Sequence, residues 1–233
     1  AWRGAVGQDL LPLPCAVVFN NNGRTPPAPN VYPLFRLSEH FALFEAFYTP
    51  ANIDAAFVTN LQRSRLLYIG QYSDEGPLFA DPELCRELRG HLEQGGLIFF
   101  DYHTGTGQRR FRPETEAFLK SVGVAVPDGF QPGYGSSGFA ASEVHALLAA
   151  PVPIGGKATG HYGWFQQWSP EQTVLARDRN DESRATLLVQ DGVAGKGTVV
   201  FSQLPSVFRS DTGVSFDLVR NVIAYAYATR RSP

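Results

Sequence analysis

Asp101, Tyr102 and His103 are the residues whose types and spacing best suit chemistry. They follow the apolar run at residues 97–100, and side chains at the carboxyl end of a parallel strand are the ones that usually touch a ligand. An aspartate beside a histidine can orient the imidazole and favour its charged form, which makes His103 a candidate general base or metal ligand and Asp101 its orienting partner. The alternative is that Asp101 caps the following turn and that His103 is simply exposed.

Aromatic side chains form a second candidate site. His161, Tyr162 and Trp164 lie within one short stretch, and Tyr134 lies in a glycine-rich segment at residues 129–138. Flat rings of this kind can stack on a sugar or anchor a protein partner. The alternative is that they cover the edge of a sheet as part of the core.

Other polar motifs give further candidates. Asn21 lies in the turn after the first predicted strand and Gln71 in the loop after the second, so both are assigned to ligand binding at strand ends. Turn formation alone also explains the asparagine. The loop at 104–110 offers backbone N–H groups and two arginines to an anion, but it lacks the lysine of a P-loop. The acidic run at 178–182 lacks the glycine and oxygen spacing of an EF-hand, so we expect a solvated turn.

Cys15 and Cys85 are the only cysteines, and neither has another Cys or a His at metal-ligand spacing. Cys15 falls in an apparent strand and Cys85 in an apparent helix, so both are interpreted as buried free thiols. A disulfide between them would require the fold to bring the two Cβ atoms together. The sequence indicates no metal site and no cofactor.

Buried strands and the turns after them must position these residues. Continuous apolar runs predict strands at 15–20, 65–70 and 97–100. Asp81 is expected to cap a helix that ends at Gly95, and the order strand, helix, strand predicts a parallel βαβ unit.

The rest of the chain alternates between helical and extended patterns. Further helices are predicted at residues 34–47, 52–57, 114–122, 142–148 and 216–227. Further strands are predicted at residues 124–126, 173–177, 186–190 and 197–202, and a hairpin-like turn at 191–196. The glycine-rich segment at 129–138 is interpreted as a loop.

Four of these segments together resemble the class I glutamine amidotransferase-like superfamily, and more closely its ThuA-like and DUF4159-type branches. They are residues 66–70, 88–101, 195–201 and 218–226. The resemblance implies a flavodoxin-like α/β fold, with a doubly wound, mainly parallel sheet and helices on both faces. It implies one domain over 1–233, with a Pro-rich surface excursion at about 23–33.

The resemblance also implies where chemistry is missing. In true amidotransferases a nucleophilic Cys follows the strand that matches residues 97–100, whereas this chain has Asp101, Tyr102 and His103 there. Neither Cys15 nor Cys85 is placed to replace that nucleophile, so glutamine hydrolysis is not expected. ThuA-like sequences often carry a His near this strand end, and His103 is similar in placement.

Composition narrows the classes of function. A net charge of −2 with scattered lysines argues against nucleic-acid binding, and no apolar run approaches the roughly 20 residues of a transmembrane helix. The absence of methionine, even at position 1, favours a processed, exported protein that is periplasmic or secreted.

Two hypotheses follow from these observations. The first is a non-catalytic amidotransferase-like module, a pseudoenzyme that binds a protein partner or helps to assemble a larger exported complex. The second is a ThuA-like enzyme acting on a carbohydrate or related small molecule, with His103 as base or metal ligand and Asp101 orienting it. The missing cysteine favours the first, so we lean against enzymatic activity.

Overall fold

Short apolar runs build the parallel half of the sheet. The computed structural model describes residues 13–18, 43–48, 55–69, 76–101, 111–204 and 213–228. Five strands pair in parallel in the order β2-β1-β3-β4-β9. All residues of β3, β4 and β9 are buried, as continuous apolar runs in a covered sheet should be. The strand bounds are β1 (Leu13–Val18), β2 (Leu43–Tyr48), β3 (Leu66–Ile69), β4 (Leu97–Asp101) and β9 (Gly197–Ser202).

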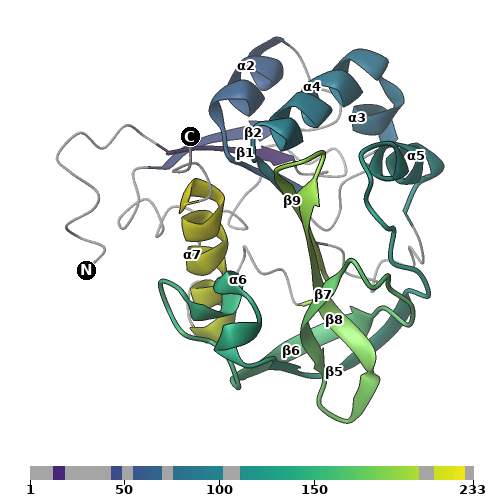
Figure 1. Cartoon of the computed structure of the whole chain (residues 1–233), viewed down its shortest axis with the longest axis vertical. Coiled ribbons are helices and arrows are strands. Elements are labelled where there is room, and N and C mark those ends of the chain that lie inside the picture. The colour runs from purple at the N-terminus through teal and green to yellow at the C-terminus, as the bar shows by residue number, and fades with distance from the viewer. Residues whose placement is uncertain are drawn as a thin grey trace, which may run out of the picture.

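Beyond β9 the sheet continues with antiparallel strands in the order β8-β7-β5-β6. Phe165 and Ala185 exchange backbone hydrogen bonds of 2.8 and 3.2 Å, and the Tyr162 N–H donates to the Gln203 carbonyl at 3.0 Å. These bonds connect the end of β6 to β8 and to the residue that follows β9. The sheet therefore curls into a half-barrel (Figure 1). The bounds are β5 (Gln131–Phe139), β6 (Ala158–Trp164), β7 (Thr173–Asp178) and β8 (Asp181–Val193).

The predicted doubly wound, mainly parallel sheet with helices on both faces was therefore wrong. The sheet is mixed, and its longest strands, β5 and β8, belong to the antiparallel half. Tight hairpins account for the difference, because a two-residue turn at Arg179 and Asn180 can join β7 to β8 only as antiparallel neighbours.

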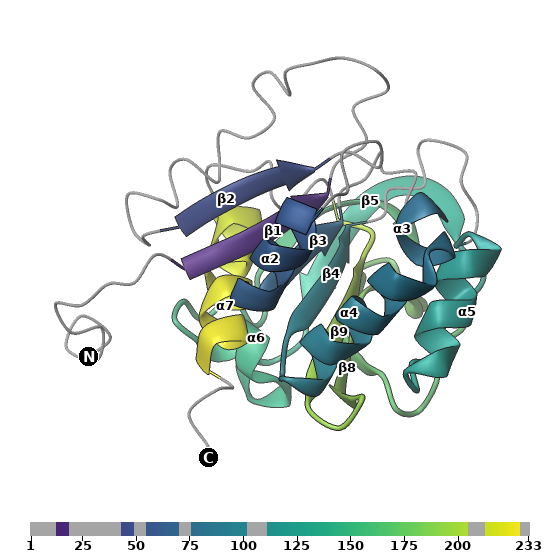
Figure 2. The same ribbon diagram turned by 90° about the horizontal axis from the view of Figure 1, so that it is seen from above.

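Helices cover the sheet as two groups, each with its own apolar cluster (Figure 2). Leu66 and Tyr68 belong to the cluster of α6 and α7, whereas Leu67 and Ile69 belong to the cluster of α2 to α5. This alternation follows from the two-residue period of a strand. The helices are α2 (Ala55–Arg63), α3 (Gly76–Ala80), α4 (Pro82–Glu93), α5 (Pro113–Ser121), α6 (Ala146–Ala149) and α7 (Gly213–Ala228), and η4 (Ser142–Val144) is a 3-10 turn.

The start of α4 confirms the capping prediction. The Asp81 carboxylate accepts hydrogen bonds from the N–H groups of Glu83 at 2.7 Å and Leu84 at 3.4 Å, with Pro82 in the first turn. After the helix, Gly95 takes a φ of 82°, which suits glycine. The predicted strand–helix–strand unit from β3 through α4 to β4 is thereby confirmed.

Three local predictions were wrong. Residues 43–47, expected in a helix, belong to β2, because strand β1 offers them a parallel partner from Leu13 to Val18. Residues 129–138, expected as a loop, largely form β5, and residues 124–126 form no strand. Apolar spacing at residues 43–47 fits helix and strand alike, and the glycines at residues 129–138 are as typical of a loop, so tertiary pairing decided both segments.

Cys85 lies in α4 and is a free, partly buried thiol that donates to the Phe79 carbonyl at 3.2 Å. Burial, with the nearby Asp81 carboxylate, raises the pKa of Cys85, so the thiol stays protonated at neutral pH. Cys15 lies in β1, and its side chain is outside the described residues. None of the described helices could span a membrane.

Two glycines of this region predict opposite responses to one added methyl group. A Cβ at Gly90, inside α4, meets no atom within 4 Å, so Gly90→Ala should raise the free energy of unfolding by about 0.5–1 kcal/mol. A Cβ at Gly96 would lie 2.3 Å from the His91 ring, so Gly96→Ala should lower it by roughly 1–3 kcal/mol. Urea unfolding measures both, and a stabilised Gly96→Ala would contradict the packing of His91.

Candidate functional site

The structure tests only part of the predicted site. Asn21, Gln71, Tyr102 and His103 lie outside the described residues, as do the loop at 104–110 and the excursion at 23–33. Asp101, His161, Tyr162 and Trp164 are described. They fall in two places, the end of β4 and strand β6.

Asp101 ends β4 in the interior of the protein. Its Oδ2 accepts a hydrogen bond from the Tyr68 hydroxyl at 2.6 Å, and the two residues are 0% and 1% exposed. Tyr68 pairs with Phe99 in the β3–β4 register and packs on its ring at 6.0 Å, so its hydroxyl reaches two residues further along β4. A carboxylate held this way is tied into the core, and sequence reasoning missed the tyrosine because only the register reveals it.

Strand β6 carries the second group of predicted residues, which joins partners that the sequence did not suggest. His161 Nε2 lies 3.5 Å from the Asp178 carboxylate, and the Arg184 guanidinium lies 4.3 Å from the centre of the Trp164 ring. Arg184 also contacts Asp178 at 3.5 Å. We call His161, Trp164, Asp178 and Arg184 the β6 cluster. The His161–Asp178 contact links β6 to β7, and Arg184 of β8 joins both strands through its ion pair with Asp178 and its cation–π contact with Trp164.

Glycines on β5 make room for the β6 cluster. A Cβ at Gly133 would lie 2.2 Å from the Trp164 ring, and a Cβ at Gly135 would lie 2.3 Å from His161 Nε2. Both rings therefore lie across the bare backbone of β5. The glycines that suggested a loop instead leave the space that two large side chains of the neighbouring strand occupy.

Electrostatics make the β6 cluster a poor acid–base catalyst. Burial lowers the pKa of His161, against the opposing effect of the Asp178 carboxylate, so the ring is neutral at neutral pH. His161 is 1% exposed, which keeps solvent and substrate protons away from it. The Trp164 Nε1 and the Gln203 amide are buried without a hydrogen-bond partner, so this region has capacity to bind a small polar group or water.

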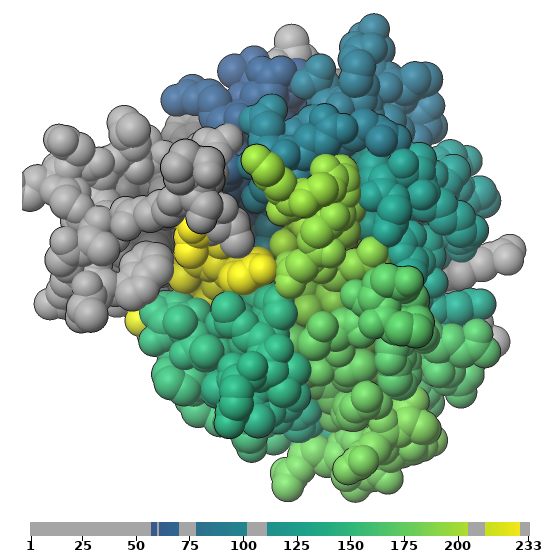
Figure 3. Space-filling view, in the orientation of Figure 1, coloured from purple at the N-terminus to yellow at the C-terminus, as the bar shows by residue number. Residues whose placement is uncertain are grey.

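Tyr162 faces the surface and pairs with Tyr134 of β5. Their ring centroids are 5.2 Å apart at an interplanar angle of 77°, an edge-to-face arrangement. Tyr134 is 83% exposed, and Tyr162 is partly buried. We call these two residues the tyrosine pair. It presents an ordered aromatic surface on the paired antiparallel strands β5 and β6. The antiparallel part of the sheet lies in the lower half of the molecule, which is coloured teal to green in the space-filling view (Figure 3).

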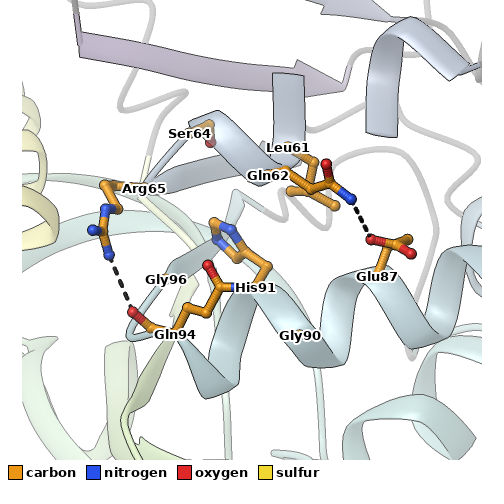
Figure 4. A pocket seen from close by; sticks show the side chains of 9 residues that line it. All are labelled: Leu61, Gln62, Ser64, Arg65, Glu87, Gly90, His91, Gln94 and Gly96. Atoms are coloured by element: carbon orange, nitrogen blue, oxygen red, sulfur yellow. Dashed lines mark hydrogen bonds between the residues drawn. The ribbon is translucent and has the colours of Figure 1, made fainter. Parts of the chain in front are cut away.

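A pocket of about 260 Å³ lies between α2 and α4 (Figure 4). It borders the amino ends of β3 and β4, whereas Asp101 lies at the carboxyl end of β4. Its lining residues are Leu61, Gln62, Ser64, Arg65, Glu87, Gly90, His91, Gln94 and Gly96. Sequence reasoning missed this site, because only the packing of α2 against α4 brings its lining residues together. The described residues include no group of three His, Cys, Asp or Glu side chains placed to hold a metal ion.

Comparisons with known proteins show a shared fold. No family model matches the chain, and no curated protein matches it in sequence. A protein from Bacteroides uniformis described as ThuA-like is 10% identical with a TM-score of 0.56, over 92% of this chain and 91% of that one. A protein from Thermoplasma acidophilum described as part of a GMP synthase is 10% identical with a TM-score of 0.52, over 93% and 96%. A beta-galactosidase from Rahnella sp. R3 is 11% identical with a TM-score of 0.56, over 91% and 31%.

These likenesses support the resemblance at the level of fold. The chain shares its fold with ThuA-like and amidotransferase-like proteins, and at such low identity a shared fold does not transfer chemistry. The replacement of the nucleophilic cysteine and the DUF4159-type branch stay predictions.

Loss of one hydroxyl should expose the role of Tyr68. Tyr68→Phe removes a hydrogen bond to a fully buried carboxylate, so it should lower the free energy of unfolding by about 1–3 kcal/mol. Tyr134→Phe is the matched control, and at an exposed site it should stay within about 0.5 kcal/mol. Equal urea midpoints for the two variants would show that the Tyr68–Asp101 bond is not formed.

His91 predicts a loss of stability in acid. Burial lowers its pKa to about 4, whereas an unfolded histidine titrates near 6.5. Between these values only the unfolded chain binds the proton, so stability falls as the pH drops from about 6.5 to 4, by roughly 3 kcal/mol in total. As the pH drops across this range, the free energy of unfolding measured in urea should fall less steeply for His91→Gln than for the native chain. Parallel curves would contradict the burial of a neutral His91.

Proposed function

We propose that this chain is a non-catalytic binding module with an amidotransferase-like fold, and that it docks a protein partner through the tyrosine pair. The observation that carries the proposal is the 83% exposure of Tyr134 in an ordered contact with Tyr162. Exposed aromatic rings that are already positioned lose little conformational freedom on binding, which is why tyrosine is frequent in protein interfaces.

The state of the titratable groups supports a binding role. Asp101 is engaged by Tyr68, His161 is buried and neutral, and the Cys85 thiol stays protonated. Each of these groups serves packing within the fold, so none of them is poised as a nucleophile or an accessible base.

The comparison with the Rahnella beta-galactosidase supports a modular role as well. The similar region covers 31% of that chain, so this fold also occurs as one part of a longer protein. A domain used in this way can contribute surface to an assembly without contributing the reacting groups.

Site-specific photo-cross-linking tests the docking surface. With a benzophenone amino acid in place of Tyr134, cells of the source organism should yield a discrete cross-linked adduct. The same amino acid in place of Val144, which is 47% exposed, should not. Tyr162→Ala should weaken the adduct because it removes the ring that holds Tyr134 in place. Equal adducts at both positions would contradict a specific surface.

A turnover assay tests the absence of catalysis. The purified chain should release neither ammonia from glutamine nor nitrophenol from nitrophenyl glycosides above the rate without protein. If it cleaves a glycoside and His103→Ala abolishes that activity while the protein stays folded, the chain is an enzyme and the proposal is wrong.

A further inference from the structure

A β-bulge brings the two rings of the tyrosine pair together. In the pairing of β5 with β6, Pro132 lies opposite Gly163 and Gly135 opposite His161. This register leaves two residues of β5, at positions 133 and 134, opposite the single residue 162 of β6. Two residues opposite one define a bulge, which bends its strand and re-aims a side chain. The edge-to-face contact of the rings therefore follows from the backbone of the two strands.

The strands that carry the tyrosine pair offer no charge to a partner. β5 and β6 contain no Asp, Glu, Lys or Arg, and their only histidine, His161, is buried and neutral. On β8, the Arg184 guanidinium is already engaged by two aspartates and by the Trp164 ring. A charged segment that docked on β5 and β6 would lose hydration without gaining an ion pair. The surface therefore favours an uncharged partner segment.

The same strands offer few hydrogen bonds to a sugar. A sugar ring carries several hydroxyl groups, and each one that leaves water needs a hydrogen-bond partner. Gln131 is the only amide side chain of β5 and β6. The hydroxyls of Ser137 and Thr159 already contact hydroxyls of β8 and α7. A ligand that needs few directional hydrogen bonds fits this surface better.

A proline-rich segment meets these conditions. In the polyproline II conformation such a segment is extended before it binds, so it loses little conformational entropy, and its carbonyls have no internal hydrogen bonds. Its pyrrolidine rings are apolar and pack on aromatic faces. Tyr134 is 83% exposed and is held by Tyr162, so it offers such a face in a fixed position. The Tyr134 hydroxyl can donate a hydrogen bond to a carbonyl of the segment.

We propose that the partner docked by the tyrosine pair is a separate protein that presents an uncharged, proline-rich segment in the polyproline II conformation. This inference rests on the docking function proposed above and specifies the chemistry of the partner. Pyrrolidine rings of the segment pack against Tyr134 and Tyr162, and one of its carbonyls accepts a hydrogen bond from the Tyr134 hydroxyl. Because no ion pair forms, salt has little effect on the affinity.

Fluorescence anisotropy with labelled octaproline as the probe tests the proposal on the full chain. Octaproline should bind the native chain, and its Kd should change less than about twofold between roughly 0.05 and 0.5 M NaCl. A glycine–serine peptide of the same length should bind at least about tenfold more weakly, because it must lose conformational freedom on binding. If octaproline does not bind the native chain, the proposal is wrong.

Matched variants locate the contact. Tyr134→Ala and Tyr162→Ala should each weaken octaproline binding by about tenfold, whereas Tyr134→Phe keeps the ring and should weaken it by only about two- to fivefold. Val144→Ala, at an exposed residue of η4, should change nothing. Because Tyr134 is so exposed, Tyr134→Ala should keep the native thermal midpoint and stays informative if Tyr162→Ala does not fold. Unchanged binding in Tyr134→Ala would overturn the proposal.

Other occupants of this surface give different results. If photo-cross-linking at Tyr134 yields an adduct but octaproline does not bind, the docking function stands and the proline-rich partner is wrong. If cellohexaose binds more tightly than octaproline and Tyr134→Ala abolishes that binding, the ligand is a carbohydrate and both proposals are wrong. This chain itself has four prolines between residues 26 and 33. Dimers of the native chain that Tyr134→Ala dissociates in sedimentation would identify a second copy as the occupant and overturn the separate partner.

Discussion

The pairing of β9 with two kinds of neighbour is the constraint on which the rest of the structure depends. β9 is parallel to β4 on one edge and antiparallel to β8 on the other, and all six of its residues are buried. It therefore joins the parallel layer to the curled half-barrel. Gly197 begins β9 where a Cβ would lie 2.8 Å from the Leu92 side chain and carbonyl, so α4 can approach the strand this closely only over glycine.

The same junction explains where the polar groups gather. Asp101 pairs with Ser202 across β4 and β9, and Gln203 continues from β9 to bond with both Thr186 and Tyr162. A buried polar region thus extends from the parallel layer into the half-barrel. Each polar group in it must find an internal partner or a bound molecule, because transfer from water without a hydrogen bond is costly.

Local sequence patterns predicted β1, β3, β4 and β9 but not β2. In the antiparallel half they predicted β7 and part of β8 but missed β5 and β6. The limits of β9 and the cap at Asp81 were correct because an apolar run and a capping aspartate act over a few residues. β5 was missed because its glycines make sense only beside the rings of His161 and Trp164, which come from another strand. For the candidate site, neither the partner of Asp101 nor the pocket at Arg65 follows from sequence spacing, since both depend on register and on helix packing.

The return of β6 to β8 and β9 also bears on how another chain can be recognised. The outer edge of β6 is occupied by the bond from Tyr162 to Gln203 and approached by α7, where Thr159 and Ser215 hydroxyls lie 3.0 Å apart. An extended peptide consequently finds little free backbone along this edge on which to add a further strand. The docking proposed for the tyrosine pair therefore relies on side chains rather than on an added strand, which makes it sensitive to single substitutions.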